Sequence, residues 1–259
     1  MKKSKIAVLV AMVVVLAFSL AACGGSDKSS SDKTVYKVGT EPTFPPFDTT
    51  DEDQNIVGLD MDLIKAIGED QGFDVEFENL SFDGLIPALK AGNIDIVAAG
   101  MNKDDEDRQK EVDFSDSYYE SKLFVAVTED NTTIKSVEDL TPDMKVAAQT
   151  GTTGASKVQE LKDAGKIKEA VILDGLVTCM MKLINGDVSA VINDKPVTEA
   201  YMKKQPDKIK MVGEALNAEN YGFAVQKGNA ELVEKINNGL KNIKENGTYD
   251  KLVDEWFNK

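Results

Sequence analysis

The sequence predicts an α/β protein, because strand patterns and helix patterns alternate along most of the chain. Short runs of β-branched and other apolar residues, such as Val35–Gly39 and Val188–Ile192, are typical of strands. Between them lie longer stretches, such as Leu59–Gln71, in which apolar residues recur at the spacing of one helix face. A chain of 259 residues that is 42% hydrophobic is long enough for two ordinary domains.

Each predicted element follows one of these two patterns. Strands are expected over Val35–Gly39, Phe73–Phe77, Ile94–Ala98, Val125–Val127, Val146–Ala148, Val171–Leu173, Val188–Ile192, Ile209–Val212 and Tyr221–Gln226. Helices are expected over Leu59–Gln71, Phe82–Ala91, Ala155–Ala164, Leu176–Ile184, Pro196–Lys204, Ala230–Asn246 and Tyr249–Phe257. Asp51, Asp53 and Asn55 imitate the start of a calcium loop but lack its Gly and Glu, which favours a polar hairpin turn. Periodicity alone allows one large sheet or two smaller lobes.

Composition excludes several classes of function. With 30 Lys and Arg against 45 Asp and Glu, the net charge of −15 offers no basic surface to a nucleic acid. The absence of His removes Ser/His and Cys/His triads, His-ligated zinc and imidazole bases. The two Cys, Cys23 and Cys179, cannot build a disulfide framework or a four-Cys metal site, and Cys179 is expected to be a buried free thiol. We expect no cofactor and no metal.

Residues 1–22 have the pattern of a signal peptide. Three Lys precede the uncharged apolar stretch Ile6–Leu20. This stretch is shorter than a membrane span, which needs about 20 residues. The segment Leu20-Ala21-Ala22-Cys23 resembles the lipobox of bacterial lipoproteins, in which cleavage leaves a diacylated Cys23 at the N-terminus. An ordinary signal peptide with a Cys nearby by chance is the alternative.

Residues 23–34 are small and polar, which is typical of a flexible tether. Cleavage before Cys23 removes three Lys and no acid, so the mature chain carries a net charge of −18. The sequence therefore predicts an exported body that is anchored to the outer side of a membrane by lipid. A protein anchored in this way is expected to pass a molecule to another membrane component, or to receive one from it.

Six segments, in this order, are similar to the polar amino-acid family of bacterial solute-binding proteins that serve ABC importers. They are Gly39–Phe47, Val57–Leu63, Phe82–Leu89, Asp113–Asp116, Gly151–Gly154 and Glu245–Tyr249. The resemblance covers nearly all of the chain from Val35 to Phe257. It implies a two-lobed, type II periplasmic-binding-protein-like fold with two crossover strands as a hinge. Lobe one would comprise 34–120 and 220–259, lobe two 121–219, with the ligand in the cleft between them.

Arg108 is the candidate for the ligand α-carboxylate. It is the single Arg of the chain, and a planar guanidinium can donate two parallel hydrogen bonds to a carboxylate. It lies five residues before Asp113-Phe114-Ser115, where the family keeps its carboxylate-binding Arg. Without the resemblance, Arg108 could equally be a solvated residue in the acidic run Asp104–Asp107.

The resemblance also implies that Gly100, Asn102, Thr152 and Thr153 contact the ligand. This chain carries one residue more than the usual family spacing between Gly100 and Arg108, and Asn102 stands where Ser or Thr is usual. The hydroxyls and backbone N–H groups of Thr152 and Thr153, where a strand meets a helix, could bind the same carboxylate. Their Gly-Thr-Thr-Gly loop lacks the Gly-Lys-Ser/Thr of a phosphate-binding P-loop.

Asp194 and three further residues complete the predicted ligand site. Asp194 follows a strand and matches the carboxylate that binds the ligand ammonium in the family, although a loop Asp before Lys195-Pro196 could also be a helix cap. Phe44 and Phe82 match rings that enclose the ligand's aliphatic part, and core packing is their alternative. Glu41 matches a position at the ligand's distal polar end, and a solvated loop acid is its alternative.

These residues predict a monomeric binding protein without catalysis, which captures an amino acid and delivers it to a membrane ABC permease. An acid at the distal end disfavours glutamate and aspartate, and favours a basic amino acid, with glutamine next. Two other classes stay open: a dehydratase-like enzyme on the same scaffold, and a ligand-sensing domain for a signalling partner.

Overall fold

The computed structural model describes residues 33–258, of which Thr34 onward forms one compact unit. The predicted signal peptide, Cys23 and nearly all of the predicted tether lie outside the described residues. Between residues 33 and 258, no helix combines the length and the apolar character needed to cross a membrane.

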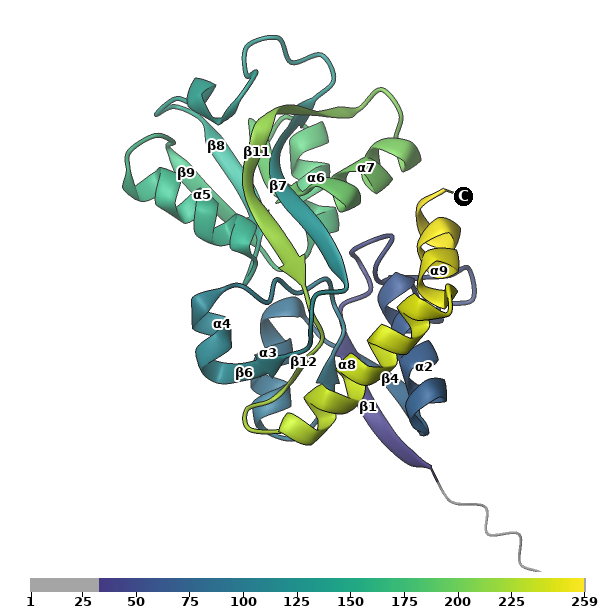
Figure 1. Ribbon diagram of the computed structural model, residues 1–259. Coiled ribbons are helices and arrows are strands. Elements are labelled where there is room, and N and C mark those ends of the chain that lie inside the picture. Colours follow the sequence, from purple (N-terminus) through teal and green to yellow (C-terminus); the bar gives the residue numbers. More distant parts are fainter. Residues whose placement is uncertain (1–32, 259) are drawn as a thin grey trace, which may run out of the picture. The chain divides into compact units, whose positions relative to one another are not determined.

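Strands and helices alternate along this unit, as the sequence pattern predicts (Figure 1). The strands are β1 (Thr34–Thr40), β2 (Thr49–Thr50), β3 (Ile56–Val57), β4 (Phe73–Asn79), β5 (Ile96–Val97), β6 (Val112–Phe114), β7 (Tyr119–Thr128), β8 (Lys145–Gln149), β9 (Glu169–Leu173), β10 (Ala190–Asp194), β11 (Ile209–Tyr221) and β12 (Ala224–Gln226). The helices are α2 (Leu59–Gln71), α3 (Phe82–Lys90), α4 (Glu106–Glu111), α5 (Thr153–Asp163), α6 (Leu176–Ile184), α7 (Lys195–Lys204), α8 (Ala230–Glu245) and α9 (Thr248–Phe257), with a 3₁₀ turn at Val137–Asp139.

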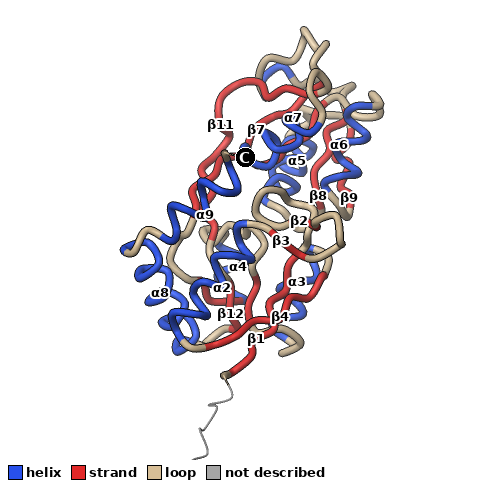
Figure 2. The backbone as a smooth tube through the Cα atoms, turned by 90° about the vertical axis from the view of Figure 1, so that its right-hand side faces the viewer, coloured by secondary structure: helices blue, strands red, loops and turns tan. Residues whose placement is uncertain are grey.

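Ten of these strands form two separate five-stranded sheets, and β2 and β3 form a two-stranded sheet. Two large sheets correspond to two lobes, not to one large sheet. The first lobe has the strand order β4-β1-β5-β12-β6, and the second has β11-β7-β10-β8-β9. The chain passes into the second sheet through β7 and returns through β11, and these two strands pair antiparallel over their length (Figures 1 and 2). This is the two-lobed fold with two crossover strands that the resemblance implies.

Helices cover both faces of each sheet, so buried strands are apolar on both sides. In β10, Ala190 and Ile192 pack in one core with Val158 of α5, while Val191 between them packs in another core with Leu183 of α6. The alternation follows from the period of two residues in a strand. In the first lobe, α2 and α8 share one core and α3 contributes to another.

The predicted strand Tyr221–Gln226 is wrong as a single element. Tyr221 ends β11 in the second sheet, whereas β12 begins at Ala224 in the first sheet. Between them, Gly222 donates its N–H to the Met101 carbonyl at 3.1 Å and Phe223 donates to Ser115 Oγ at 2.9 Å. An apolar pattern cannot show this change of partner, because both parts are buried.

The polar turn before β3 is confirmed: Asp51 Oδ1 accepts hydrogen bonds from Asp53 N at 2.9 Å and Asn55 N at 2.8 Å, inside the β2–β3 hairpin. Helix α4 was not predicted, since its six residues are too few to show a periodic pattern. Cys179 is fully buried, as expected.

Candidate functional site

The cleft between the two lobes gathers most of the predicted site residues. The cavity between these residues has a volume of about 20 Å³. We define the cleft by its lining residues, which are Phe44, Phe82, Gly100, Asn102, Arg108, Gln149, Thr152, Thr153, Asp194 and Glu219. Eight of these were predicted from the sequence, whereas Gln149 and Glu219 were not.

Arg108 is held in the cleft by the short helix α4. The Asp105 side chain caps this helix, since its Oδ1 accepts hydrogen bonds from Asp107 N at 3.1 Å and Arg108 N at 2.9 Å. The acidic run is therefore a helix start, and the Arg108 side chain is 8% exposed rather than solvated. Its Nη2 donates to the Gly151 carbonyl in the second lobe at 2.9 Å. Arg108 thus touches both sides of the cleft.

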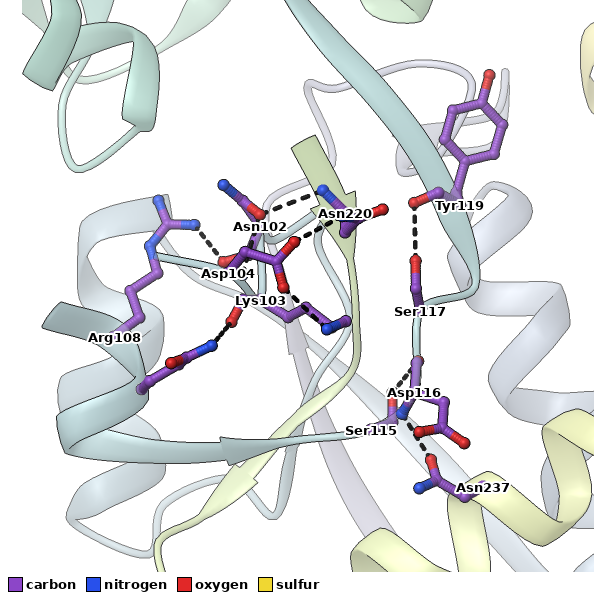
Figure 3. A network of polar contacts seen from close by, with 11 residues as sticks. Asn102, Lys103, Asp104, Arg108, Ser115, Asp116, Ser117, Tyr119, Asn220 and Asn237 are labelled. Atoms are coloured by element: carbon purple, nitrogen blue, oxygen red, sulfur yellow. Dashed lines mark hydrogen bonds and ion pairs between the residues drawn. The ribbon is translucent and has the colours of Figure 1, made fainter. Parts of the chain in front are cut away.

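The loop before α4 accommodates the additional residue without moving Arg108 out of the cleft. Lys103 N donates to the Asn220 carbonyl at 2.7 Å, and Asn220 N donates to Asn102 Oδ1 at 3.2 Å (Figure 3). The Asn102 carbonyl in turn accepts from Arg108 Nη1 at 3.1 Å. The amide oxygen of Asn102 is therefore occupied, and only its Nδ2 group can donate to a ligand.

Gly100 is positioned by a buried carboxylate beneath the cleft. Its φ of +54° lies in the left-handed region, and a Cβ would lie 2.7 Å from Phe44 Cε1. Asp60 Oδ2 accepts the Gly100 N–H at 2.7 Å and the Tyr118 hydroxyl at 2.7 Å. Burial raises the pKa of Asp60 to about 7, against the effect of these two hydrogen bonds.

Asp194 directs its side chain at the crossover strands, not at the helix that follows it. It stands at the N-cap position of α7, but its side chain makes no capping hydrogen bond. Its Oδ1 instead accepts from the Tyr221 hydroxyl at 2.5 Å and from Ser121 Oγ at 3.1 Å. Burial raises the pKa of Asp194 to about 6, while these hydrogen bonds and Arg108 act in the opposite direction.

The polar groups of Thr152 and Thr153 differ in whether they are already bound to other groups of the protein or could bind a ligand. The Thr152 hydroxyl donates to the Gln149 carbonyl at 2.7 Å and accepts from Ala155 N at 3.1 Å, so it caps α5. The backbone N–H of Thr152 donates to the Gln149 carbonyl at 3.3 Å. The expectation that the Thr152 hydroxyl binds a ligand carboxylate thus conflicts with its capping role. Thr153 lines the cleft together with Glu219, and its hydroxyl acts to lower the pKa of that carboxyl.

Glu41 lies directly behind the cleft and does not line it. Its Oε2 accepts from Gln149 Nε2 at 2.6 Å, and its Oε1 accepts from Thr43 Oγ1 at 2.9 Å. The Gln149 contact joins the lobes. Glu41 is 8% exposed, which contradicts the alternative of a solvated loop acid, and burial raises its pKa.

The two predicted aromatic walls have different surroundings. The Phe82 ring lies 5.4 Å from the Arg108 guanidinium carbon, so a cation–π contact steadies that side chain. Phe44 packs against Phe47 and Tyr221, with ring centroids 6.1 and 6.5 Å away. Both Phe44 and Phe82 still line the cleft, whereas Phe47 is fully buried.

Glu219 and Gln149 escaped prediction for different reasons. Glu219 lies in β11, beyond the Ile209–Val212 segment that carries the strand pattern. Gln149 ends β8 and lies just before the Gly151–Gly154 segment. In α/β folds, ligands bind at the carboxyl ends of strands, and that rule could have indicated Gln149. No comparable signal marks Glu219.

Comparison with known proteins identifies the family. The profile of the bacterial extracellular solute-binding proteins, family 3, matches residues 36–259. The chain belongs to this family.

Relatives of this chain include two proteins of Bacillus subtilis strain 168. The arginine-binding extracellular protein ArtP is 33% identical over 252 residues, which cover 96% of each chain. The L-cystine-binding protein TcyA is 33% identical over 273 residues, which cover 99% of this chain and 98% of TcyA. Among solved structures, an ancestral arginine-binding protein bound to arginine is 44% identical, with a TM-score of 0.82 over 87% of this chain and 99% of that one.

Proposed function

We propose that this protein captures a basic amino acid in the cleft, as a monomer and without catalysis. The observation that carries the proposal is the charge of the buried groups. Asp194 lies in the cleft and Glu41 directly behind it, and Arg108 is the one cation among the residues that line the cleft. A ligand with a net positive charge compensates this excess of acids, whereas an acidic ligand would add to it.

Each part of an α-amino acid has a partner in this arrangement. Arg108 would exchange its contacts to the Asn102 and Gly151 carbonyls for the ligand α-carboxylate. Asp194 uses Oδ1 for Tyr221 and Ser121, which leaves Oδ2 for the ligand ammonium. At the distal end, the Glu41–Gln149 pair would accept hydrogen bonds from a guanidinium, an ammonium or an imidazolium.

Two of the three relatives reported above agree with a basic ligand, and TcyA does not. The relatives above carry names for binding arginine or cystine, and the structural neighbour was solved with arginine bound. Glutamine is the second candidate, because its amide could pair with Gln149 and Glu41. It would leave the excess of negative charge uncompensated.

A thermal-shift screen of the twenty amino acids and cystine tests the ligand class. We expect the largest rise in Tm with arginine, lysine or histidine, because a bound ligand stabilises the folded state by mass action. Glu41→Gln should lower the shift for that ligand, since the distal carboxylate is lost. Glu234→Gln, an exposed position on α8, removes the same charge and should have no effect. A large shift with glutamate alone, or tighter basic-ligand binding by Glu41→Gln, would contradict the proposal.

We also propose that Cys23 carries a diacylglyceryl group, and that the anchored protein delivers its ligand to an ABC permease on the outer side of the membrane. The support is the Leu20-Ala21-Ala22-Cys23 segment after a short apolar stretch, together with the family. Mass spectrometry of the membrane-extracted protein should show a lipid-modified N-terminal Cys23. Cys23→Ser should appear in the released fraction without lipid. An unmodified N-terminus at another residue in the extracted protein would exclude the anchor.

A further inference from the structure

Glu219 is a buried acid in the cleft that the family resemblance does not account for. It lies on the crossover strand β11 and is 1% exposed. Its Oε1 accepts a hydrogen bond from Asn217 Nδ2 at 2.7 Å, and Thr153 and Arg108 line the same cleft. A carboxylate in this place would face the ligand group that Arg108 is expected to bind.

The charged groups that act on Glu219 are Asp194 from β10 and Arg108 from α4. The other groups around it are neutral: Asn217 on its own strand, Thr153 on α5, and Ser121, its partner residue on β7. The charged neighbours of Ser121, Glu120 and Lys122, point to the opposite face of the sheet because side chains alternate along a strand. Glu219 therefore has one like charge and one opposite charge beside it.

Two carboxylates and one guanidinium cannot all be matched by the head group of an amino acid. If Arg108 binds the α-carboxylate and Asp194 binds the ammonium, an ionised Glu219 is left unpaired in a closed cleft, which is costly. A neutral Glu219 removes that cost and gains an O–H donor. For a basic ligand, the charges then balance: Arg108 against carboxylate, Asp194 against ammonium, and Glu41 against the side chain.

We propose that Glu219 enters the complex as a neutral carboxylic acid whose O–H donates to the ligand α-carboxylate, so that binding takes up one proton from solution. The inference rests on the proposed function to the extent that the ligand is an α-amino acid. Glu219 is in this view a further residue that selects for an α-carboxylate.

The titration of the cleft supports this assignment. Burial, followed by the charge of Asp194, raises the pKa of Glu219 to about 7 in the free protein, and an approaching ligand carboxylate raises it further. Affinity should therefore be full below pH 7 and fall as the pH rises through the Glu219 pKa of the complex. A ligand ammonium beside Asp194, whose pKa is about 6, favours its ionised form, so binding near or below pH 6 releases a proton from Asp194 to solvent. This release is opposite in sign to the uptake by Glu219, and it is absent at pH 8, where Asp194 is already ionised.

Calorimetry of L-arginine binding at pH 8, in two buffers of different ionisation enthalpy, counts the protons. Wild-type protein should take up roughly 0.5–1 proton per ligand at pH 8. Its affinity at pH 6 should be higher than its affinity at pH 8. Glu219→Gln keeps an N–H donor but cannot take up a proton, so its proton uptake should vanish and its affinity should no longer fall between pH 6 and pH 8. Glu214→Gln, at an exposed position on the same strand, should behave as wild type.

Three results would overturn the proposal: proton release or no uptake by wild type at pH 8, uptake that persists in Glu219→Gln, or a large loss of affinity in Glu219→Gln at both pH values. The last result would show an anionic Glu219 bound to the ligand cation. If Glu219→Gln does not fold, an infrared difference spectrum of wild type at pH 8 decides the matter: a protonated carboxyl band must appear on binding. If arginine fails to bind but L-glutamine binds, only the basic-ligand proposal fails. The proton count is then made with glutamine, which has the same α-carboxylate.

Discussion

Replacing Arg108 by Lys or by Ala should weaken amino-acid binding by about two orders of magnitude or more. A charge-assisted hydrogen bond contributes about 1.5–3 kcal/mol, and a bidentate pair contributes two of them. Lys should be nearly as damaging as Ala, because an ammonium is a point charge without the planar fork. Arg108 would exchange its Nη1 and Nη2 contacts to the Asn102 and Gly151 carbonyls for the two oxygens of the ligand carboxylate. Calorimetric titration of each variant with the amino acid that gives the largest thermal shift measures the effect.

Lys110→Ala is the matched control for this experiment. Lys110 lies on the same helix, is exposed and pairs with Asp107 outside the cleft, so its loss should leave the affinity unchanged. Unchanged affinity in both Arg108 variants would show that the carboxylate is bound elsewhere in the cleft.

Replacing Gly58 by Ala should lower the free energy of unfolding by about 3 kcal/mol or more. Gly58 precedes α2 with φ +146° and ψ 171°, a region that is almost restricted to Gly. A Cβ there would lie 2.1 Å from the Phe47 carbonyl oxygen, which belongs to rigid backbone. That same oxygen accepts the Asp60 N–H at 2.9 Å, so the clash also disturbs the residue that holds Gly100. Urea unfolding followed by circular dichroism measures the change.

Gly72→Ala separates the two contributions to this effect. Gly72 also has a positive φ, +78°, but a Cβ there would meet nothing within 4 Å. Its substitution should therefore cost only about 1–2 kcal/mol, the strain of a left-handed residue. Equal losses in the two variants would show that the Phe47 clash is relieved by a backbone shift.

Helices with a complete apolar pattern could be predicted closely. A very short helix, and the point where the chain changes from one sheet to the other, could not. The bounds of α2 and α6 agree with the prediction to the residue, because each has a full apolar face and a Gly before its first turn. Helix α4 has too few residues for periodicity, although Asp105 before two further acids is a capping signal that could have revealed it. The end of β11 could not be distinguished from β12, because burial on both sides hides a change of sheet.

The site residues divide in the same way. Ordered motifs indicated Arg108, Asp194, Gly100 and the two aromatic walls, all of which the structure brings to one cleft. The direction of each polar group was not predictable, because it depends on partners distant in the sequence. Asp194 could have been a cap until the Tyr221 hydroxyl, 27 residues later, was seen to bind its Oδ1.

By itself, the sequence determined the alternation of strands and helices, the family, the absence of His chemistry and the one guanidinium available for a carboxylate. Those features are local or compositional, so they do not depend on how the chain returns on itself. Only the tertiary structure decided that there are two five-stranded sheets, that Glu41 lies behind Gln149, and that Glu219 lines the same cleft as Arg108 and Asp194. The physical reason is that burial and charge pairing arise between segments, and an acid on a crossover strand acquires its neighbours only when both lobes have folded around it.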